Sequence, residues 1–247
     1  MTKKQLDQRT ATALYSTVDG AGLDRCRSKN HNAWATGAEP HIEGWEYPRL
    51  AQLRIAALPT RARSYRGKGG LNDTTLQCRK GCQRRETLVH ISGSCWSTRE
   101  QRLRGHNIIV NSLVSQAQQQ RKQVIIEPHI MTAAGLRKPD LIVYDEKKAM
   151  VIDAAVPCET TTPSLSTSSK KKAEYYKDEI RRYVTTRLPG RDVSFHGFVV
   201  SAQGGFSDEN AEVCRALRMS PRQQQLLVVR VMMGTWHLWR HFSADYL

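Results

Sequence analysis

Two aspartates in the second half of the chain are the strongest candidates for catalytic chemistry. Asp140 opens the apolar run 140–144 (DLIVY), and Asp153 interrupts the apolar run 149–156 (AMVIDAAV). A hairpin of two such strands would bring both carboxylates to the same edge of a sheet. Carboxylate oxygens and water are the ligands that Mg²⁺ prefers, and a cation held there could activate water and neutralise charge on a phosphoryl oxygen. The spacing therefore predicts a Mg²⁺ site suited to phosphodiester hydrolysis.

A lysine could complete this site by stabilising the charge that develops on the phosphate. Lys172 lies near the start of a predicted helix over residues 169–188, and Lys170 and Lys171 compete with it for this role. We favour Lys172 because Tyr176 follows one turn later on the same face and would turn that face toward the sheet.

Glu127, which ends the preceding apolar run, is a further carboxylate candidate for the metal site. A simpler alternative is that Asp140 only caps a turn and that the lysines are a solvated start of a helix. Asp153 would still need an explanation, because a carboxylate inside an apolar run is costly without a partner charge or a metal.

Four potential metal ligands lie together upstream, with the spacing C-x3-C-x7-H-x4-C: Cys78, Cys82, His90 and Cys95. Three thiolates and one imidazole are the ligand types that close a tetrahedral structural Zn²⁺ site. Gly81 would allow the tight turn that aims both first cysteines at one ion. The alternative is a set of free cysteines with an incidental histidine. A closed four-ligand site leaves no position for substrate, so its predicted role is structural.

The charge of the chain favours a polyanionic partner. It has 38 Lys and Arg against 23 Asp and Glu, a formal net charge of +15 and a pI near 9.8. Release of counterions from phosphates would drive binding of such a protein to nucleic acid, although a solvated basic face or a membrane-surface patch would have the same charge. The residues that we predict to contact nucleic acid are Arg79, Lys80, Arg84, Arg85, Lys138 and Tyr176.

The length of 247 residues suffices for one core and a small satellite module. We expect a basic, partly helical segment over 1–77, a zinc knuckle over 78–96 and a catalytic domain over 97–247. The six cysteines are too few and too unevenly spaced for a disulfide scaffold. No run is apolar enough to span a bilayer, and the polar start lacks the apolar part of a signal peptide, so an intracellular protein is expected.

The hydrophobic pattern predicts the order αβββαβα from residue 98 onward. Helices are expected over 98–120 and 169–188, and a last helix begins at Pro221 with Ser220 as its cap. Strands are expected over 124–130, 140–144, 149–156 and 193–201. The predicted buried face of the first helix consists of Leu103, Asn107, Val110, Leu113, Val114 and Ala117.

Upstream of the cysteines, the pattern is weaker. Residues 50–58 (LAQLRIAAL) predict one helix whose partners in the core are expected outside this chain, and residues 64–70 (SYRGKGG) predict a flexible basic segment. Near the other end, Trp236, His237 and Trp239 could stack on bases, but their helical spacing favours packing in the core.

Several motifs, in this order, together resemble the C-terminal region of R2-type non-LTR retrotransposon polyproteins. They are CRKGC with ETLVHISGSC, then GHNIIVN, then KPDLIVYDEKKAMVIDAAV, then KKKAEYY. The resemblance implies a zinc knuckle followed by an endonuclease of the PD-(D/E)xK, restriction-enzyme-like class with an αβββαβ core, which makes the expected fold class α+β.

Carried over by motif, the resemblance makes Asp140, Asp153 and Lys172 the catalytic residues. It also implies the substrate and the use of the nicked strand. Such an endonuclease nicks ribosomal DNA in the nucleus, and the freed 3′-hydroxyl primes reverse transcription of the element's RNA by an upstream region of the same polyprotein.

Two features depart from the wider pattern. Ala155 stands where most nucleases of this class have a lysine, so the lysine must come from the helix. No YxDD-type motif of a polymerase occurs, so copying is not expected of this chain. A nucleic-acid-binding zinc module with an inactive nuclease core is the alternative to an active nickase, and a nuclease selective for branched DNA is a third reading.

Overall fold

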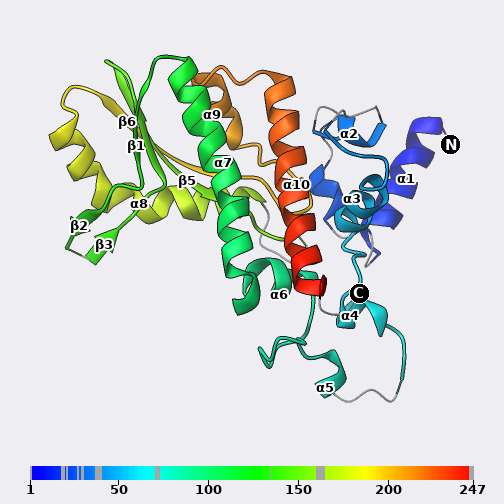
Figure 1. The fold of residues 1–247 in the computed structure, drawn as a ribbon. Coiled ribbons are helices and arrows are strands. Elements are labelled where there is room, and N and C mark those ends of the chain that lie inside the picture. Colours follow the sequence, from blue (N-terminus) through cyan, green and yellow to red (C-terminus); the bar gives the residue numbers. More distant parts are fainter. Residues whose placement is uncertain are drawn as a thin grey trace.

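A computed structural model of the chain contains helices packed on both faces of a small mixed sheet (Figure 1). The structure describes residues 2–17, 20, 22–26, 28, 31–36, 41–69, 73–133, 135–159 and 165–244. Gly70 of the predicted flexible segment lies outside these residues. The mixture of helices with a largely antiparallel sheet confirms the α+β class. Within the described residues, no helix combines the length and the hydropathy that crossing a membrane requires.

The central sheet has four strands in the order β1-β4-β5-β6. These are β1 (Gln123–Ile126), β4 (Leu141–Tyr144), β5 (Lys148–Ala155) and β6 (Asp192–Val199). The first three pair antiparallel, whereas β5 and β6 pair parallel. A parallel pair needs a long crossover, and here the helix α8 (Leu165–Arg187) provides it.

A second hairpin, β2 (Ile130–Thr132) with β3 (Gly135–Arg137), was not expected from the pattern. The single strand predicted over 124–130 is wrong, because the chain leaves the sheet after Ile126. Glu127 adopts a positive φ of 45°, and Pro128 follows, so neither residue continues a regular strand.

Both faces of the sheet are buried. Leu141 and Val143 of β4 point into the larger core, whereas Ile142 between them points into a smaller core beneath α8. This alternation follows from the two-residue period of a strand. The larger core is covered by α7 (Arg99–Gln119) and α10 (Pro221–Ser243), which pack against each other. The sheet is therefore the middle layer between α8 and the α7–α10 pair (Figure 1).

The long helices lie where the sequence predicts them. The Ser220 hydroxyl caps α10 by accepting the N–H of Gln223, and Pro221 occupies the first turn. The buried face of α7 differs from the prediction, because Leu103 is 54% exposed and Asn107 is also exposed. The buried residues of α7 are instead Ile109, Val110, Leu113, Gln116 and Ala117, all in its C-terminal half. The short helix α9 (Asn210–Ala216) was not predicted.

The N-terminal part of the described chain consists of helices, several of which contact α10 (Figure 1). They are α1 (Lys3–Tyr15), η1 (Leu23–Cys26), α2 (Ala33–Thr36), α3 (Tyr47–Arg54), α4 (Arg61–Ser64), α5 (Asp73–Leu76), α6 (Leu88–Gly93) and η2 (Trp96–Thr98).

Helix α3 ends at Arg54 rather than at residue 58, because Ala56 adopts a positive φ of 51°. The expectation that its core partners lie outside this chain is wrong. Leu50 and Leu53 are fully buried in the same core as α10, and the indole N–H of Trp239 donates to the carbonyl of Pro59 at 3.2 Å. Trp236 and Trp239 stack on each other in this core, as their spacing predicts. The predicted domain boundaries after residues 77 and 96 stay predictions.

Leu53→Ala tests this packing. The change should lower the free energy of unfolding by about 2–5 kcal/mol, because it leaves a cavity between α3 and α10. Urea unfolding followed by circular dichroism measures the change. Ile55→Ala is the matched control, since Ile55 is 36% exposed and should lose far less. Equal losses for both variants would mean that α3 does not depend on α10.

Candidate active site and metal centre

Asp140 and Asp153 meet at one edge of the sheet because of the register of β4 and β5. Leu141 pairs with Ile152, which leaves the two aspartates as the next opposed pair. One carboxylate oxygen of Asp140, Oδ2, accepts the backbone N–H of Ala154 at 2.6 Å. Asp153 is only 4% exposed. The hairpin thus brings the carboxylates together as the sequence predicts, and their catalytic role stays a prediction.

Lys172 lies closest of the three candidate lysines to this pair. Its Nζ is 2.8 Å from Oδ2 of Asp153, whereas Lys170 and Lys171 are exposed. Tyr176, one turn later, is buried against the sheet and donates its hydroxyl to the carbonyl of Lys138 at 3.1 Å. This bond also anchors the chain just before Asp140. Tyr176 therefore orients the helix, and the prediction that it contacts nucleic acid stays untested.

Gly197 allows α8 to approach the sheet at this point. It pairs with Asp153 in the parallel register of β5 and β6. A Cβ at Gly197 would lie 2.2 Å from the carbonyl oxygen of Ser169 and 2.8 Å from the Cβ of Lys172. The hydroxyl of Ser169 donates to the carbonyl of Gly197 at 2.6 Å and holds the two elements together. The reach of Lys172 to Asp153 thus depends on a glycine in the neighbouring strand.

His106 of α7 is a member of the site that the residue pattern did not single out. Its Nε2 lies 3.0 Å from Oδ2 of Asp140. This contact raises the pKa of His106, although burial opposes the increase. The GHNIIVN motif of the resemblance contains this histidine. No spacing rule could connect it with Asp140, because the two residues are 34 positions apart and meet only through packing of α7 on the sheet.

The two carboxyl groups have opposite pKa shifts. Burial and the neighbouring Asp140 raise the pKa of Asp153 to about 7, against the opposing effect of Lys172. Burial also favours the neutral form of Asp140, but the hydrogen bonds from His106, Asp153 and the Ala154 N–H outweigh it and lower its pKa. Two carboxylates this close cannot easily ionise together. A divalent cation would remove this conflict, and carboxylate oxygens are the ligands that a hard cation such as Mg²⁺ prefers, so the Mg²⁺ site stays a prediction.

Glu127 is adjacent to this site through its backbone, whose N–H donates to the carbonyl of Asp140 at 2.8 Å. Its side chain is exposed. Among the described residues, the one group of three or more ligand side chains within 4.8 Å of each other is the cysteine and histidine cluster, so the carboxylate of Glu127 does not join the aspartates there. Its role as a metal ligand stays a prediction.

The four residues of the predicted knuckle converge on one point. Their ligand atoms all lie within 4.8 Å of one another. Sγ of Cys95 is 3.9 Å from that of Cys78 and 3.6 Å from that of Cys82. Sulfurs bound to one tetrahedral Zn²⁺ at about 2.3 Å would be separated by about 3.8 Å. Gly81 has a φ of +78° and closes the turn between the first two cysteines.

The fourth ligand is already oriented. His90 lies on α6, where the Thr87 hydroxyl caps the helix by accepting the His90 N–H at 3.1 Å. Its Nδ1 bonds the Ser94 hydroxyl at 3.1 Å, and its buried Nε2 has no hydrogen-bond partner among the described residues. A metal commonly takes one nitrogen while the other bonds a neighbouring group. The cluster could therefore hold a metal ion such as zinc.

The basic residues around the knuckle differ in their surroundings. The guanidinium of Arg79 makes a two-point ion pair with the fully buried Glu86, with Nη2 2.6 Å from Oε1 and Nε 2.8 Å from Oε2. The Nζ of Lys80 lies 5.9 Å from the centre of the Phe242 ring. Arg84 and Arg85 are exposed, as is Lys138 beside the carboxylate pair. Arg79 thus has a structural contact that the sequence did not predict, and phosphate contacts stay predictions for all five.

No family model matches the chain, but curated proteins do. It is 28% identical over 98% of its length to the "Retrovirus-related Pol polyprotein from type-2 retrotransposable element R2DM" of Drosophila melanogaster, covering 23% of that protein. It is also 28% identical, again over 98% of its length, to the R2 Pol polyprotein of Nasonia vitripennis, covering 24%. The chain thus spans about a quarter of the length of these relatives. They confirm the resemblance to the R2 polyproteins.

Metal analysis tests the knuckle. Purified protein should contain about one zinc per chain, because the four ligands converge as a tetrahedral site requires. Cys82→Ser should lose this zinc, since a hydroxyl is a poor ligand in place of a thiolate. Cys214→Ser is the control, because Cys214 is a buried thiol outside the cluster, and it should keep the metal. A wild-type protein without zinc would contradict the assignment.

Gly197→Ala tests the contact between α8 and β6. The added Cβ must displace the Ser169 carbonyl, so we expect about 1–3 kcal/mol of lost unfolding free energy, measured with urea. The shift of α8 should also separate Lys172 from Asp153. Gly44→Ala is the control, because a Cβ at Gly44 meets no atom within 4 Å and should leave stability close to wild type. A Gly197→Ala protein as stable as wild type would refute this account of the helix contact.

Proposed function

We propose that this chain is the C-terminal region of an R2-type retrotransposon polyprotein and acts as a divalent-metal-dependent DNA endonuclease of the PD-(D/E)xK class. The observation that carries the proposal is the convergence of Asp140, Asp153 and Lys172 at one sheet edge, within the order α7-β-sheet-α8-β6. The resemblance to R2 polyproteins over nearly the whole chain supports it independently.

Asp140 and Asp153 are the residues that would hold a Mg²⁺ ion. When bound, such an ion lowers the pKa of a water molecule and neutralises charge on the phosphate. His106 and the Ala154 N–H orient the Asp140 carboxylate, so that its position does not depend on the ion. Lys172 contributes a positive charge next to Asp153, which would stabilise the charge that develops on a phosphate bound there.

The substrate is proposed to be double-stranded DNA at a ribosomal target in the nucleus. One strand is nicked, and its 3′-hydroxyl primes reverse transcription of the element's RNA by the upstream region of the polyprotein. The net charge of +15 supports a nucleic-acid partner. The exposed Arg84 and Arg85, beside a zinc-stabilised knuckle, are the side chains best placed to contact phosphates.

A nucleic-acid-binding module without cleavage is the second candidate. It is favoured by the knuckle, whose closed ligand set and basic neighbours would suffice for binding alone. In that case the buried Asp153 would be a remnant of a catalytic site. The two candidates differ in one measurable respect, because only the nuclease needs the carboxylates.

Nicking of supercoiled plasmid in the presence of Mg²⁺ distinguishes them. Wild-type protein should convert supercoiled DNA into open circles. Asp140→Ala, Asp153→Ala and Lys172→Ala should each lower the rate about a hundredfold or more, because the first two remove ligands of the cation and the third removes positive charge beside the reacting phosphate.

Lys171→Ala is the matched control, since it removes the same charge from an exposed neighbour on the same helix and should nick at nearly the wild-type rate. Gel-shift binding of the same plasmid is measured in parallel. Binding without open circles by the wild type would reject the nuclease in favour of the binding module.

A further inference from the structure

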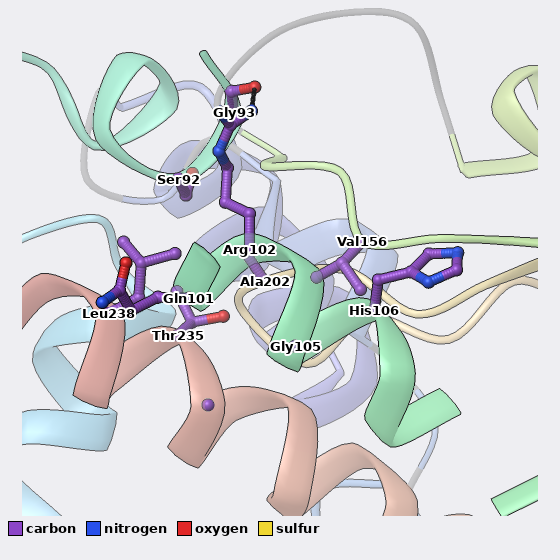
Figure 2. A pocket seen from close by; sticks show the side chains of 11 residues that line it. Ser92, Gly93, Gln101, Arg102, Gly105, His106, Val156, Ala202, Thr235 and Leu238 are labelled. Carbon is purple, nitrogen blue, oxygen red and sulfur yellow. Dashed lines mark hydrogen bonds between the residues drawn. The ribbon is translucent and has the colours of Figure 1, made fainter. Parts of the chain in front are cut away.

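A cavity of about 200 Å³ lies between α6, α7 and α10, outside the carboxylate pair and outside the metal cluster (Figure 2). One face of α7 forms its main wall through Gln101, Arg102, Gly105 and His106. Figure 2 shows Arg102 extending from α7 toward Gly93, which follows the metal-binding histidine on α6, whereas His106 points to the other side, past Val156. The cavity is therefore lined both by residues next to the knuckle and by His106, which contacts the carboxylate pair.

His106 shows how close the cavity lies to the candidate active site. Its Nε2 lies 3.0 Å from Oδ2 of Asp140, so the residue that lines the cavity also contacts a predicted metal ligand.

Two polar atoms on this wall lack partners within the described part of the chain. They are Oε1 of Gln101, an acceptor, and Nε of Arg102, a donor, and both atoms are buried. Buried polar atoms are rarely left without a hydrogen bond. Arg102 is also held in place, because its Nη2 donates to the carbonyl of Cys95 at 3.1 Å and its Nη1 donates to that of Gly93. An acceptor and a fixed donor are what the edge of a nucleobase can satisfy.

Gly105 has no structural reason to be glycine. It lies inside α7, where glycine is less favourable than alanine, and it is absent from the residues with positive φ. A Cβ built on Gly105 would meet no atom within 4 Å. Gly234, which faces it from α10, differs, because a Cβ there would lie 3.0 Å from the side chain of Ile108. Packing of the two helices thus accounts for Gly234. Gly105 also lies at this contact, with its Cα 3.8 Å from that built Cβ, but open space remains where its own side chain would be.

We propose that this cavity binds one unpaired nucleobase of the DNA strand. The base would lie against the bare backbone of α7 at Gly105, with its edge toward Gln101 and Arg102. Its placement beside the cut phosphate rests on the proposed endonuclease function, but the binding of a base does not require cleavage.

The test compares two short fluorescent DNA strands of equal length and charge, one of thymidines and one without bases. Fluorescence anisotropy without divalent cations measures their affinities, so no cleavage is needed. We expect wild-type protein to prefer the thymidine strand by about tenfold, as for about one to two hydrogen bonds gained. Gly105→Leu fills the cavity and should reduce this preference about fivefold, the size of effect expected for the loss of one such hydrogen bond. Gly105→Ala should give an intermediate value.

Two controls separate loss of the cavity from loss of the fold. Gln118→Leu places the same leucine side chain at an exposed position of the same helix, away from the cavity. This variant should leave the preference for the thymidine strand unchanged. Gly105→Ala should unfold at the same or a higher temperature than wild type, because alanine favours the helix. A stable variant with a lower base preference is the expected result.

The inference is overturned if the wild type shows no preference for bases, or if both Gly105 variants keep the full preference. Plasmid nicking measured on the same proteins separates the two proposals. If the wild type nicks plasmid and Gly105→Leu keeps the full preference for bases, the base-binding cavity is rejected and the endonuclease is retained. Absence of nicking together with the expected loss of preference rejects the endonuclease and retains the base-binding site.

Discussion

Two carboxyl groups that share one edge of the sheet repel each other once both are ionised, and burial increases this repulsion because little water remains to screen it. The pKa of Asp153, raised to about 7, reflects this burial and repulsion. Three groups from three elements offset it: the Ala154 N–H from β5, His106 from α7 and Lys172 from α8. The same pair of charges therefore determines how two helices must approach the sheet, one on each face. A cation at this edge would bind carboxylates that the surrounding residues already hold in place.

Much of this arrangement follows from local sequence patterns. The two-residue alternation of β4 and β5 fixes which faces are buried, and the thirteen-residue separation of Asp140 and Asp153 makes them opposed once a hairpin forms. The four ligands of the knuckle lie within 18 residues, so their spacing alone predicts convergence. Each of these inferences needs only neighbours along the chain or across one turn.

The parts that were missed depend on contacts between distant elements. The role of Gly197 appears only when α8 crosses over β6, and that of His106 only when α7 packs on the sheet edge. The exposure of Leu103 is not predicted because helical period alone does not fix which face meets a partner; α10 packs on the face of Gly105, Ile109 and Leu113, which is rotated away from Leu103. The hairpin of β2 and β3 was missed because its strands are too short to display a pattern, and the positive φ of Glu127 has no sequence signal, since it is not a glycine.

Helix α7 contacts both the knuckle and the carboxylate pair. Near its start, Arg102 donates to the carbonyls of Gly93 and Cys95, so the first turns of α7 are tied to the segment that carries two of the four predicted metal ligands. One turn later, His106 holds Asp140. A helix transmits a displacement along its axis because its turns are hydrogen-bonded to one another. A metal at the cysteine cluster would therefore do more than fold its own loop: by fixing the start of α7, it would also fix the position of His106, and through it the orientation of a carboxylate at the other end of the cavity.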